Sequence, residues 1–371
     1  MEDIKVEQPP CKRKKVENGA TNVINGSTKA RIRVGSRKSQ LALFQSNFVV
    51  DLLKENYGSI KYDIITMTTT GDKILDVALS KIGEKSLFTK ELEVALEKLE
   101  VDIIVHSLKD LPTSLPPGMV IGAICKRENP FDVAVFPPDS NCKDLKSLPP
   151  GSHFSVIGTS SLRRVAQLRK MYPNLAFQSV RGNLNTRLRK LDEDKTFSAL
   201  ILAAAGLIRL DLANRIDQTF TPEECMHAVG QGALAIECRE DDLETIQLIS
   251  KISDKDTTLC CIAERSFMKT LEGGCSVPVA VYSKIEGKKL TLQGGVFSLD
   301  GCKSIIEKIS TEIEHADKCV PKQHYAGVIA PRLPQYCLCN AEHLGMELAE
   351  LLLSKGAADI LKEARAKNDS S

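Results

Sequence analysis

Patterns typical of strands and helices occur in the same order twice along this chain of 371 residues. Short apolar runs between turn residues indicate strands, and apolar residues three and four positions apart indicate helices. A strand–helix–strand–helix–strand order predicts a parallel sheet with right-handed crossovers. Two such units predict two lobes, with a ligand cleft where the strands end. The first unit comprises residues 31–35, 40–56, 61–68, 88–99 and 101–106, and the second comprises 154–158, 162–170, 176–180, 183–191 and 199–204.

Both helices of the first unit are predicted to be amphipathic, with the apolar residues in one row. The row is Leu41, Phe44, Phe48 and Leu52 in the first helix, and Phe88, Leu92, Leu96 and Leu99 in the second.

The order of the patterns changes at about residue 256. One helical pattern (258–271) is followed by three strand patterns (277–285, 290–297 and 304–313) and two helical ones (341–353 and 357–366). This order predicts a small α+β domain. Residues 315–340 have weak periodicity and are expected to form a surface insertion.

Composition fits a globular protein of enzyme size. The chain is 42% hydrophobic, and its longest apolar run, 199–208, is too short to span a bilayer. The first thirty residues include several acids, which argues against a signal or transit peptide. The twelve cysteines are therefore expected to be free thiols, and their spacing indicates no zinc site. The basic run 12–15 is either a nuclear address or, as we expect, part of a disordered tail.

Residues 145–191 contain six arginines and three lysines but no acid, although the net charge of the whole chain is only +2. A guanidinium can bind a carboxylate or phosphate through two parallel hydrogen bonds. Arginines that no local acid neutralises therefore indicate a polyanionic ligand, whereas a solvated helix face usually mixes both signs. These arginines are Arg163, Arg164, Arg169, Arg181, Arg187 and Arg189.

Thr159, Ser160 and Ser161 lie where a predicted strand is followed by a predicted helix, and Arg163 and Arg164 fall in the first helical turn. Small hydroxyl side chains can cap the helix while free backbone N–H groups face an anion. Cations at this positive end of the helix dipole are poorly placed unless an anion joins them. The alternative is an ordinary helix cap with two exposed arginines.

Lys109 and Asp110 follow the strand predicted at 101–106. Parallel sheets hold their chemistry at the carboxyl ends of strands, so Asp110 is a candidate acid–base group or a candidate stabiliser of a developing cation. An exposed Lys–Asp turn explains the pair equally well. His106, inside the apolar strand, is expected to be a hydrogen-bonded core histidine rather than a catalyst.

Cys275 follows Gly273 and Gly274 on a turn between a predicted helix and a predicted strand. Paired glycines allow the backbone to approach another group closely, and nearby cations would favour the thiolate. An inert core cysteine is the commoner situation for a single cysteine.

Five motifs, in order along the chain, resemble those of the hydroxymethylbilane synthase (porphobilinogen deaminase) family, and specifically its animal members. They are Val-Gly-Ser-Arg-Lys-Ser-Gln-Leu-Ala (34–42), His-Ser-Leu-Lys-Asp-Leu-Pro (106–112), Gly-Thr-Ser-Ser-Leu-Arg-Arg (158–164), Arg-Gly-Asn (181–183) and Leu-Glu-Gly-Gly-Cys (271–275). The resemblance extends from about residue 32 to residue 368, and residues 315–340 are similar to an extra segment of the animal enzymes. It implies two α/β lobes like those of periplasmic binding proteins, a central cleft and a small α+β C-terminal domain.

The resemblance also implies a transferase of haem and tetrapyrrole biosynthesis. Such enzymes join four porphobilinogen molecules head to tail, with loss of ammonia each time, on a dipyrromethane cofactor held by a cysteine thioether. Every unit carries an acetate and a propionate, which would be the anions that the arginines bind. Loss of ammonia leaves an electrophilic azafulvene, and a carboxylate near the pyrrole N–H stabilises the positive charge.

By resemblance, Asp110 is this carboxylate, Lys109 and Arg37 assist it, and Cys275 holds the cofactor. Arg181 is either structural or helps to move the growing chain. Further residues are expected to bind carboxylates or to line the cleft, and none is expected to bind a metal. They are Ser39, Thr159, Ser160, Ser161, Arg163, Arg164, Arg187, Arg209, Gln231 and Gly232.

The implied division of the chain is a disordered tail (1–29), a first lobe (30–127 and 229–252), an arginine-rich second lobe (128–228) and a third domain (255–367). A cytosolic monomer is expected, with no nucleic acid or membrane partner. One alternative is a non-enzymatic two-lobe binder of a small polyanion, which leaves Lys109, Asp110 and Cys275 without a role. Another is nucleic-acid binding, which predicts stacking aromatics and a basic net charge, and the chain has neither.

Overall fold

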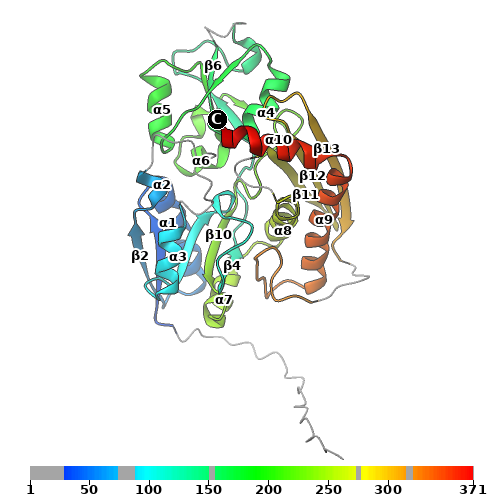
Figure 1. The fold of residues 1–371 in the computed structure, drawn as a ribbon. Coiled ribbons are helices and arrows are strands. Elements are labelled where there is room, and N and C mark those ends of the chain that lie inside the picture. The colour runs from blue at the N-terminus through cyan, green and yellow to red at the C-terminus, as the bar shows by residue number, and fades with distance from the viewer. Residues whose placement is uncertain (1–28, 74–87, 150–154, 273–276, 315–320, 371) are drawn as a thin grey trace, which may run out of the picture.

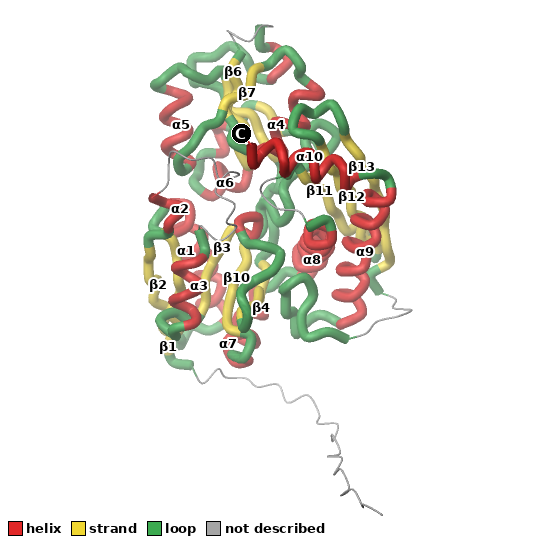
Figure 2. The backbone as a smooth tube through the Cα atoms, in the orientation of Figure 1, coloured by secondary structure: helices red, strands yellow, loops and turns green. Residues whose placement is uncertain are grey.

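The computed structural model describes residues 29–73, 88–149, 155–272, 277–314 and 321–370. These residues form two five-stranded sheets and one three-stranded sheet. Figure 1 shows a first lobe mainly in blue and cyan, with a returning segment in yellow-green, a second lobe in green and a third part in yellow to red. Figure 2 shows in the same view that helices flank the strands in each part.

The first sheet has the strand order β2-β1-β3-β10-β4. β1 is parallel to β2 and β3, as predicted, whereas β10 returns from the second lobe and is antiparallel to β3 and β4. The sequence patterns did not predict β4, β10 or α7. The strands are β1 (Arg31–Arg37), β2 (Lys61–Met67), β3 (Ile103–Ser107), β4 (Met119–Ile124) and β10 (Leu234–Arg239), and the helices are α1 (Gln40–Asn56), α2 (Thr70–Lys73), α3 (Lys90–Glu97) and α7 (Leu243–Ile249).

The second sheet has the equivalent order β7-β6-β8-β5-β9. β6 is parallel to β7 and β8, while β5, which the chain enters from the first lobe, is antiparallel to β8. Each sheet thus contains one antiparallel strand at a crossing between the lobes. The elements are β5 (Asp132–Val135), β6 (Val156–Gly158), α4 (Leu162–Met171), β7 (Ala176–Gln178), α5 (Leu184–Asp192), β8 (Ala199–Ala203), α6 (Ala204–Arg209) and β9 (Gln218–Thr219).

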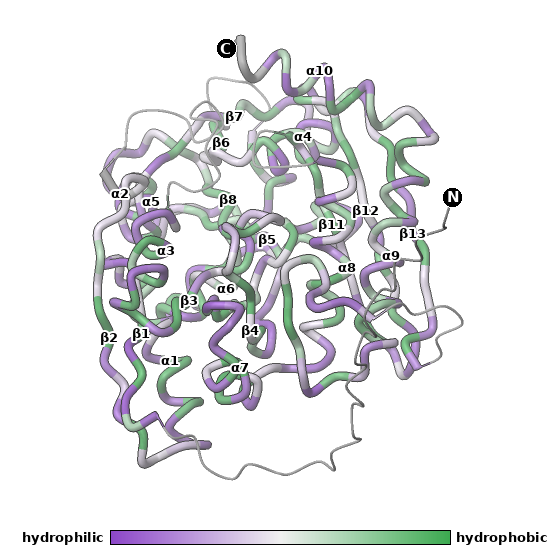
Figure 3. Tube along the Cα trace, turned by 60° about the horizontal axis from the view of Figure 1, so that its bottom comes forward, coloured by the Kyte–Doolittle hydropathy of each residue, from purple (hydrophilic) through white to green (hydrophobic). Residues whose placement is uncertain are grey.

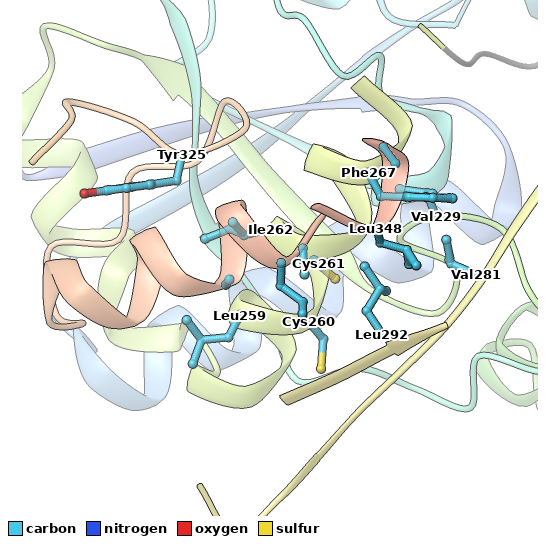
Figure 4. Packing of buried hydrophobic residues seen from close by; sticks show 14 of the residues in the cluster. Val229, Leu259, Cys260, Cys261, Ile262, Phe267, Val281, Leu292, Tyr325 and Leu348 are labelled. Carbon is cyan, nitrogen blue, oxygen red and sulfur yellow. The ribbon is translucent and has the colours of Figure 1, made fainter. Parts of the chain in front are cut away.

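The third part is an antiparallel sheet, β11-β12-β13, packed against helices. Its elements are α8 (Lys255–Thr270), β11 (Val279–Glu286), β12 (Lys289–Phe297), β13 (Ser304–Glu312), α9 (Gln335–Ser354) and α10 (Ala357–Ser370). Figure 4 shows α8 residues Cys261 and Phe267 close to Leu348 of α9 and Leu292 of β12. The same hydrophobic cluster includes Leu108 and Ile121 of the first lobe, so the third part shares a core with that lobe. The predicted class, two α/β lobes and an α+β domain, is confirmed.

The apolar row predicted on the first helix is wrong by about one residue. The buried residues of α1 include Val49, Val50 and Leu53, which pack in the same cluster as β1, whereas Phe44 and Phe48 are 43% and 41% exposed. In the next helix Leu99 is 58% exposed and has a positive φ of 61°, because α3 has ended before it. The helix α1 carries two neighbouring rows of apolar residues, one with Phe44 and Phe48 and one with Val49 and Leu53. Contact with the first sheet determines that the second row is buried.

The described part of the predicted surface insertion is a surface segment only in part: residues 321–324 are exposed, 325–330 are mostly buried, and 335–340 begin α9. Tyr325, Ala326 and Val328 are at most 2% exposed. Val328 forms a bridge beside Ile121 of the edge strand β4, and Ala326 O accepts a hydrogen bond from Arg265 Nε (3.0 Å). Residues 325–328 lack periodicity because their backbone pairs with a sheet edge and a buried arginine instead of forming a helix. Residues 315–320 lie outside the described residues.

His106 is a satisfied core histidine, as predicted. It is 6% exposed, and its Nε2 lies 2.9 Å from Oε2 of the fully buried Glu237 on β10.

Figure 3 shows hydrophobic and hydrophilic residues alternating along most helices. None of the described helices is long and apolar enough to cross a membrane.

Candidate functional site

A cleft of about 280 Å³ is lined by all three parts of the protein. Eight of the predicted site residues are among those that line it. The lining residues are Lys109, Asp110, Leu111, Pro112, Thr113, Ser160, Ser161, Leu162, Arg163, Arg164, Arg187, Ala228, Val229, Gln231, Met268, Val277 and Val279.

The three hydroxyl residues before α4 shape the loop as well as the cleft. Ser161 is the N-cap of α4, and its Oγ accepts a hydrogen bond from the Arg164 N–H (3.5 Å). Thr159 Oγ1 accepts a hydrogen bond from the Ser161 N–H (3.3 Å), and Ser160 Oγ donates to Val180 O (2.6 Å). Ser160 and Ser161 line the cleft, whereas Thr159 is buried beneath it.

Arg163 and Arg164 do have an acid partner, contrary to the expectation from the sequence. Asp132, at the start of β5, is fully buried and lies 2.6 Å from Arg163 Nη1 and 2.6 Å from Arg164 Nη2. Burial alone would raise the pKa of Asp132, but the attraction of the two guanidiniums outweighs burial and holds that pKa well below its usual range. Asp132 precedes the acid-free stretch in sequence, so only the pairing of β5 with β8 brings it under α4.

Arg187 makes no ion pair within the described residues. It lies in the first turns of α5, and its Nε donates to Gly182 O (2.8 Å). The pKa of Arg187 is lowered to about 10, mainly by burial and in part by the charges of Arg164 and Arg181, while Asp110 opposes them. The guanidinium remains charged at neutral pH, so it faces the cleft as an uncompensated cation.

Lys109 and Asp110 lie on a short 3-10 helix (Leu108–Asp110) at the carboxyl end of β3. Asp110 is exposed to the cleft and Lys109 is partly buried. Burial lowers the pKa of Lys109 to about 8; the charges of Arg164 and Arg163 also lower it, while Asp110 and Asp132 raise it. Lys109 therefore loses its charge at mildly alkaline pH.

We expect this titration to appear in the pH dependence of anion binding. Lys109 is charged below about pH 8, so affinity for a carboxylate ligand should fall as the pH rises through that value. Lys109→Arg keeps its charge and should flatten the profile. The check is the Michaelis constant, or the dissociation constant of a ligand, from pH 6.5 to 9.5. An identical alkaline decline in both proteins would assign it to another group.

Besides Thr159, four described site residues lie outside the lining of this cleft. The Arg37 guanidinium is 4.3 Å from the centre of the Phe88 ring, a cation–π distance, and Ser39 is the N-cap of α1. Arg209 Nη2 donates to Gly232 O (2.6 Å), which ties the second lobe to the return crossing. Gly232 has φ +86°, and a Cβ there would lie 2.3 Å from Glu128 O of the other crossing, so only glycine fits.

Two models of one family match most of the chain. The model described as "Porphobilinogen deaminase, dipyromethane cofactor binding domain" matches residues 32–247, and that described as "Porphobilinogen deaminase, C-terminal domain" matches residues 258–323. The chain belongs to the porphobilinogen deaminase family. It is 48% identical to the porphobilinogen deaminase of Nostoc sp. over 341 residues, 92% of this chain and 96% of that protein. It is also 48% identical to that of Synechococcus elongatus over 332 residues, 90% of this chain and 95% of that protein.

Similarity to solved structures of other proteins is weaker. The periplasmic VFT2 domain of BvgS from Bordetella pertussis covers 60% of this chain and 86% of its own, with a TM-score of 0.37 and 13% identity. The alignment with the methionine binding protein MetQ covers 60% of this chain and 90% of the MetQ chain, with a TM-score of 0.36 and 14% identity. The description of the fold rests on the sheet order of the chain itself.

The cofactor of porphobilinogen deaminases is dipyrromethane, and the cleft suits it. The cleft walls carry four cations, Lys109, Arg163, Arg164 and Arg187, against Asp110 and the buried Asp132. Apolar surface from Met268, Val277 and Val279 faces the same space. An aromatic group with several carboxylates needs this combination. Cys275 itself lies outside the described residues, but Val277, two residues later, lines the cleft.

Asp132 is the main site residue of this chain that sequence reasoning missed. One signal was available: Asp132 opens a short apolar run, 132–135, directly after the Asn129-Pro130 break. An acid at the first position of a buried strand needs a cation partner. No group of three or more histidine, cysteine or acidic side chains in the described ranges is arranged to hold a metal.

Proposed function

We propose that this chain is a hydroxymethylbilane synthase. It joins four porphobilinogen molecules head to tail, with loss of four ammonia molecules, and one water molecule adds to the end of the finished chain to release it as linear hydroxymethylbilane. The observation that carries the proposal is the combination, in one cleft, of the Lys109–Asp110 pair with the guanidinium of Arg187, which has no ion-pair partner among the described residues. A polyanion binder would need the arginine but not the acid.

Charge complementarity supports a substrate with several carboxylates. Each porphobilinogen carries two, and the cleft walls have more cations than acids. Arg187 and Lys109 are the cations with no carboxylate contact within hydrogen-bonding distance in the described residues, so they are the first that an acetate or propionate would meet. Charge-assisted hydrogen bonds from these side chains would orient the pyrrole ring.

Asp110 would stabilise the positive charge that develops when ammonia leaves and when the next pyrrole attacks. Its carboxylate is exposed to the cleft and makes no hydrogen bond within the described residues that would have to be broken. Bound dipyrromethane supplies the free pyrrole carbon to which the first substrate is added. We assign its attachment to Cys275, on the turn that leads to Val277 in the cleft wall.

The remaining assignments follow from the same proposal. The first lobe is taken as 30–127 and 229–252, the second as 128–228 and the third as 255–367. Strands of the first sheet fall in both segments of that first lobe, which supports the division. We further propose a cytosolic monomer that works without nucleic acid.

Arg187→Leu tests the proposed function. We expect kcat/KM for porphobilinogen to fall about ten- to a hundred-fold, since one charge-assisted contact contributes about 1.5–3 kcal/mol. The melting temperature should not fall, because a partly buried guanidinium without a carboxylate partner does not stabilise the fold. The check is ammonia release together with thermal unfolding.

Arg189→Leu is the matched control for this experiment. Arg189 is on the same helix, is 55% exposed and pairs with Glu193. Its replacement should leave kcat/KM near the starting value. Equal activity of the two variants, or no ammonia release by the unmodified protein, would refute the proposal.

A further inference from the structure

We propose that Asp132 is a positioning residue for the carboxylate-binding arginines. It would fix the direction in which Arg163 and Arg164 face the cleft and so decide which of their N–H groups a ligand can reach. The inference rests on the proposed function and adds a residue that lies outside the cleft lining.

The contacts of Asp132 hold both guanidiniums at once. Its Oδ2 accepts from Arg163 Nη1 (2.6 Å), and its Oδ1 accepts from Arg164 Nε (3.0 Å) and Nη2 (2.6 Å). All three residues are at most 6% exposed. The carboxylate therefore defines the plane and spacing of two neighbouring arginine side chains.

Backbone carbonyl groups complete the orientation. Arg163 Nη1 also donates to Met226 O (2.6 Å), and Arg164 Nη1 donates to Ile201 O (2.8 Å). Arg163 Nη2 lies 3.5 Å from Gln231 Oε1. Three of the five N–H donors of each guanidinium are thus used within the described residues, and two on each are left for a ligand.

Asp132 also connects the arginines to the crossing between the lobes. Gln231 Nε2 donates to Asp132 Oδ1 (2.9 Å) and to Pro130 O (2.7 Å). Gln231 lines the cleft on the return crossing, and Pro130 lies on the outward one. The network therefore sets the position of the arginines relative to both crossings as well as to each other.

A simple charge model and a positioning model make opposite predictions for Asp132→Asn. Removal of the negative charge makes the cleft more positive, so charge alone would strengthen carboxylate binding. If orientation dominates, the amide releases one or both guanidiniums and binding weakens although the positive potential rises. The sign of the change in KM therefore separates the two models.

The test compares Asp132→Asn with Asp192→Asn, using holoenzyme. Asp192 forms a two-contact pair with Arg215 (2.7 and 3.0 Å) in the same lobe but does not line the cleft. We expect KM for porphobilinogen to rise at least ten-fold in Asp132→Asn, with a smaller change in kcat, and to stay unchanged in Asp192→Asn. An unchanged or lower KM in folded Asp132→Asn overturns the proposal. Inactivity of the unmodified protein would instead refute the proposed function.

A charge-balanced pair of variants covers the case in which Asp132→Asn does not fold. Arg164→Gln is compared with the double variant Asp132→Asn/Arg164→Gln, which buries no additional unpaired charge. Positioning predicts that the double variant has the higher KM, because Arg163 has lost its anchor. A lower KM in the double variant means that Asp132 only neutralises charge, and the proposal fails.

Discussion

Replacement of Cys275 by serine is expected to lower the mass of the purified protein by two linked pyrrole units and to abolish turnover. A serine hydroxyl is a much weaker nucleophile than a thiolate and would not form the link to the cofactor. Incubation of the unmodified protein with porphobilinogen should instead add a ladder of up to four further units at the same position. Intact mass spectrometry and peptide mapping measure both results.

The chemistry of the other thiols supports this choice of cysteine. Burial raises the pKa of Cys125, Cys225, Cys238 and Cys260 to about 12, so these thiols are not nucleophiles at neutral pH. Cys302 is exposed and serves as the matched control, since Cys302→Ser should retain the mass increment and the activity. A protein that is active at its unmodified mass, or an increment on another cysteine, would exclude both the attachment site and the proposed function.

Asp110→Asn should leave the cofactor bound but lower kcat about a hundred- to a thousand-fold, the usual effect of removing a group that stabilises charge in the transition state. The amide has the shape of the carboxylate but no negative charge to offer a developing cation. The side chain is exposed in the cleft, so the substitution should not affect folding. Single-turnover measurements and the holoenzyme mass separate elongation from cofactor assembly.

A surface carboxylate gives the control for this second substitution. Asp139 is 72% exposed, lies 3.5 Å from Lys195 and does not line the cleft. Asp139→Asn should keep the kcat of the unmodified protein. If Asp110→Asn also keeps the kcat of the unmodified protein, Asp110 has no catalytic role, and the alternative of an ordinary exposed Lys–Asp turn is correct.

The structure changes what we expect of Arg163 and Arg164 in the arginine-rich stretch. From the sequence, replacement of either by leucine would remove a ligand contact and spare the fold. Both pair with a fully buried acid, so Arg164→Leu leaves Asp132 with one partner fewer in the interior. Breaking a buried ion pair typically costs about 3–5 kcal/mol, so stability should fall together with activity.

Local patterns predicted elements whose faces differ clearly in polarity. The bounds of α1, 40–56, were predicted to the residue, since Ser39 is an N-cap and the apolar spacing is helical throughout. β4, β5 and β10 were missed because they are antiparallel additions outside the strand–helix–strand repeats, whereas β3 and β8, equally buried on both faces, fall within those repeats and were predicted. The segment after residue 320 was misassigned because its partners, Ile121 and Arg265, are far away in sequence.

The order of the residues alone predicted the two repeated α/β units, the α+β end, the Lys109–Asp110 pair at a strand end and the family to which the motifs belong. These are local properties, set by residue spacing and by side-chain type. The packed fold was needed to show which face of α1 is buried, which arginines are already paired, and that Arg187 keeps its charge for a ligand. Ion pairing and burial depend on contacts between residues such as Asp132 and Arg163, 31 positions apart, and spacing along the chain does not encode them.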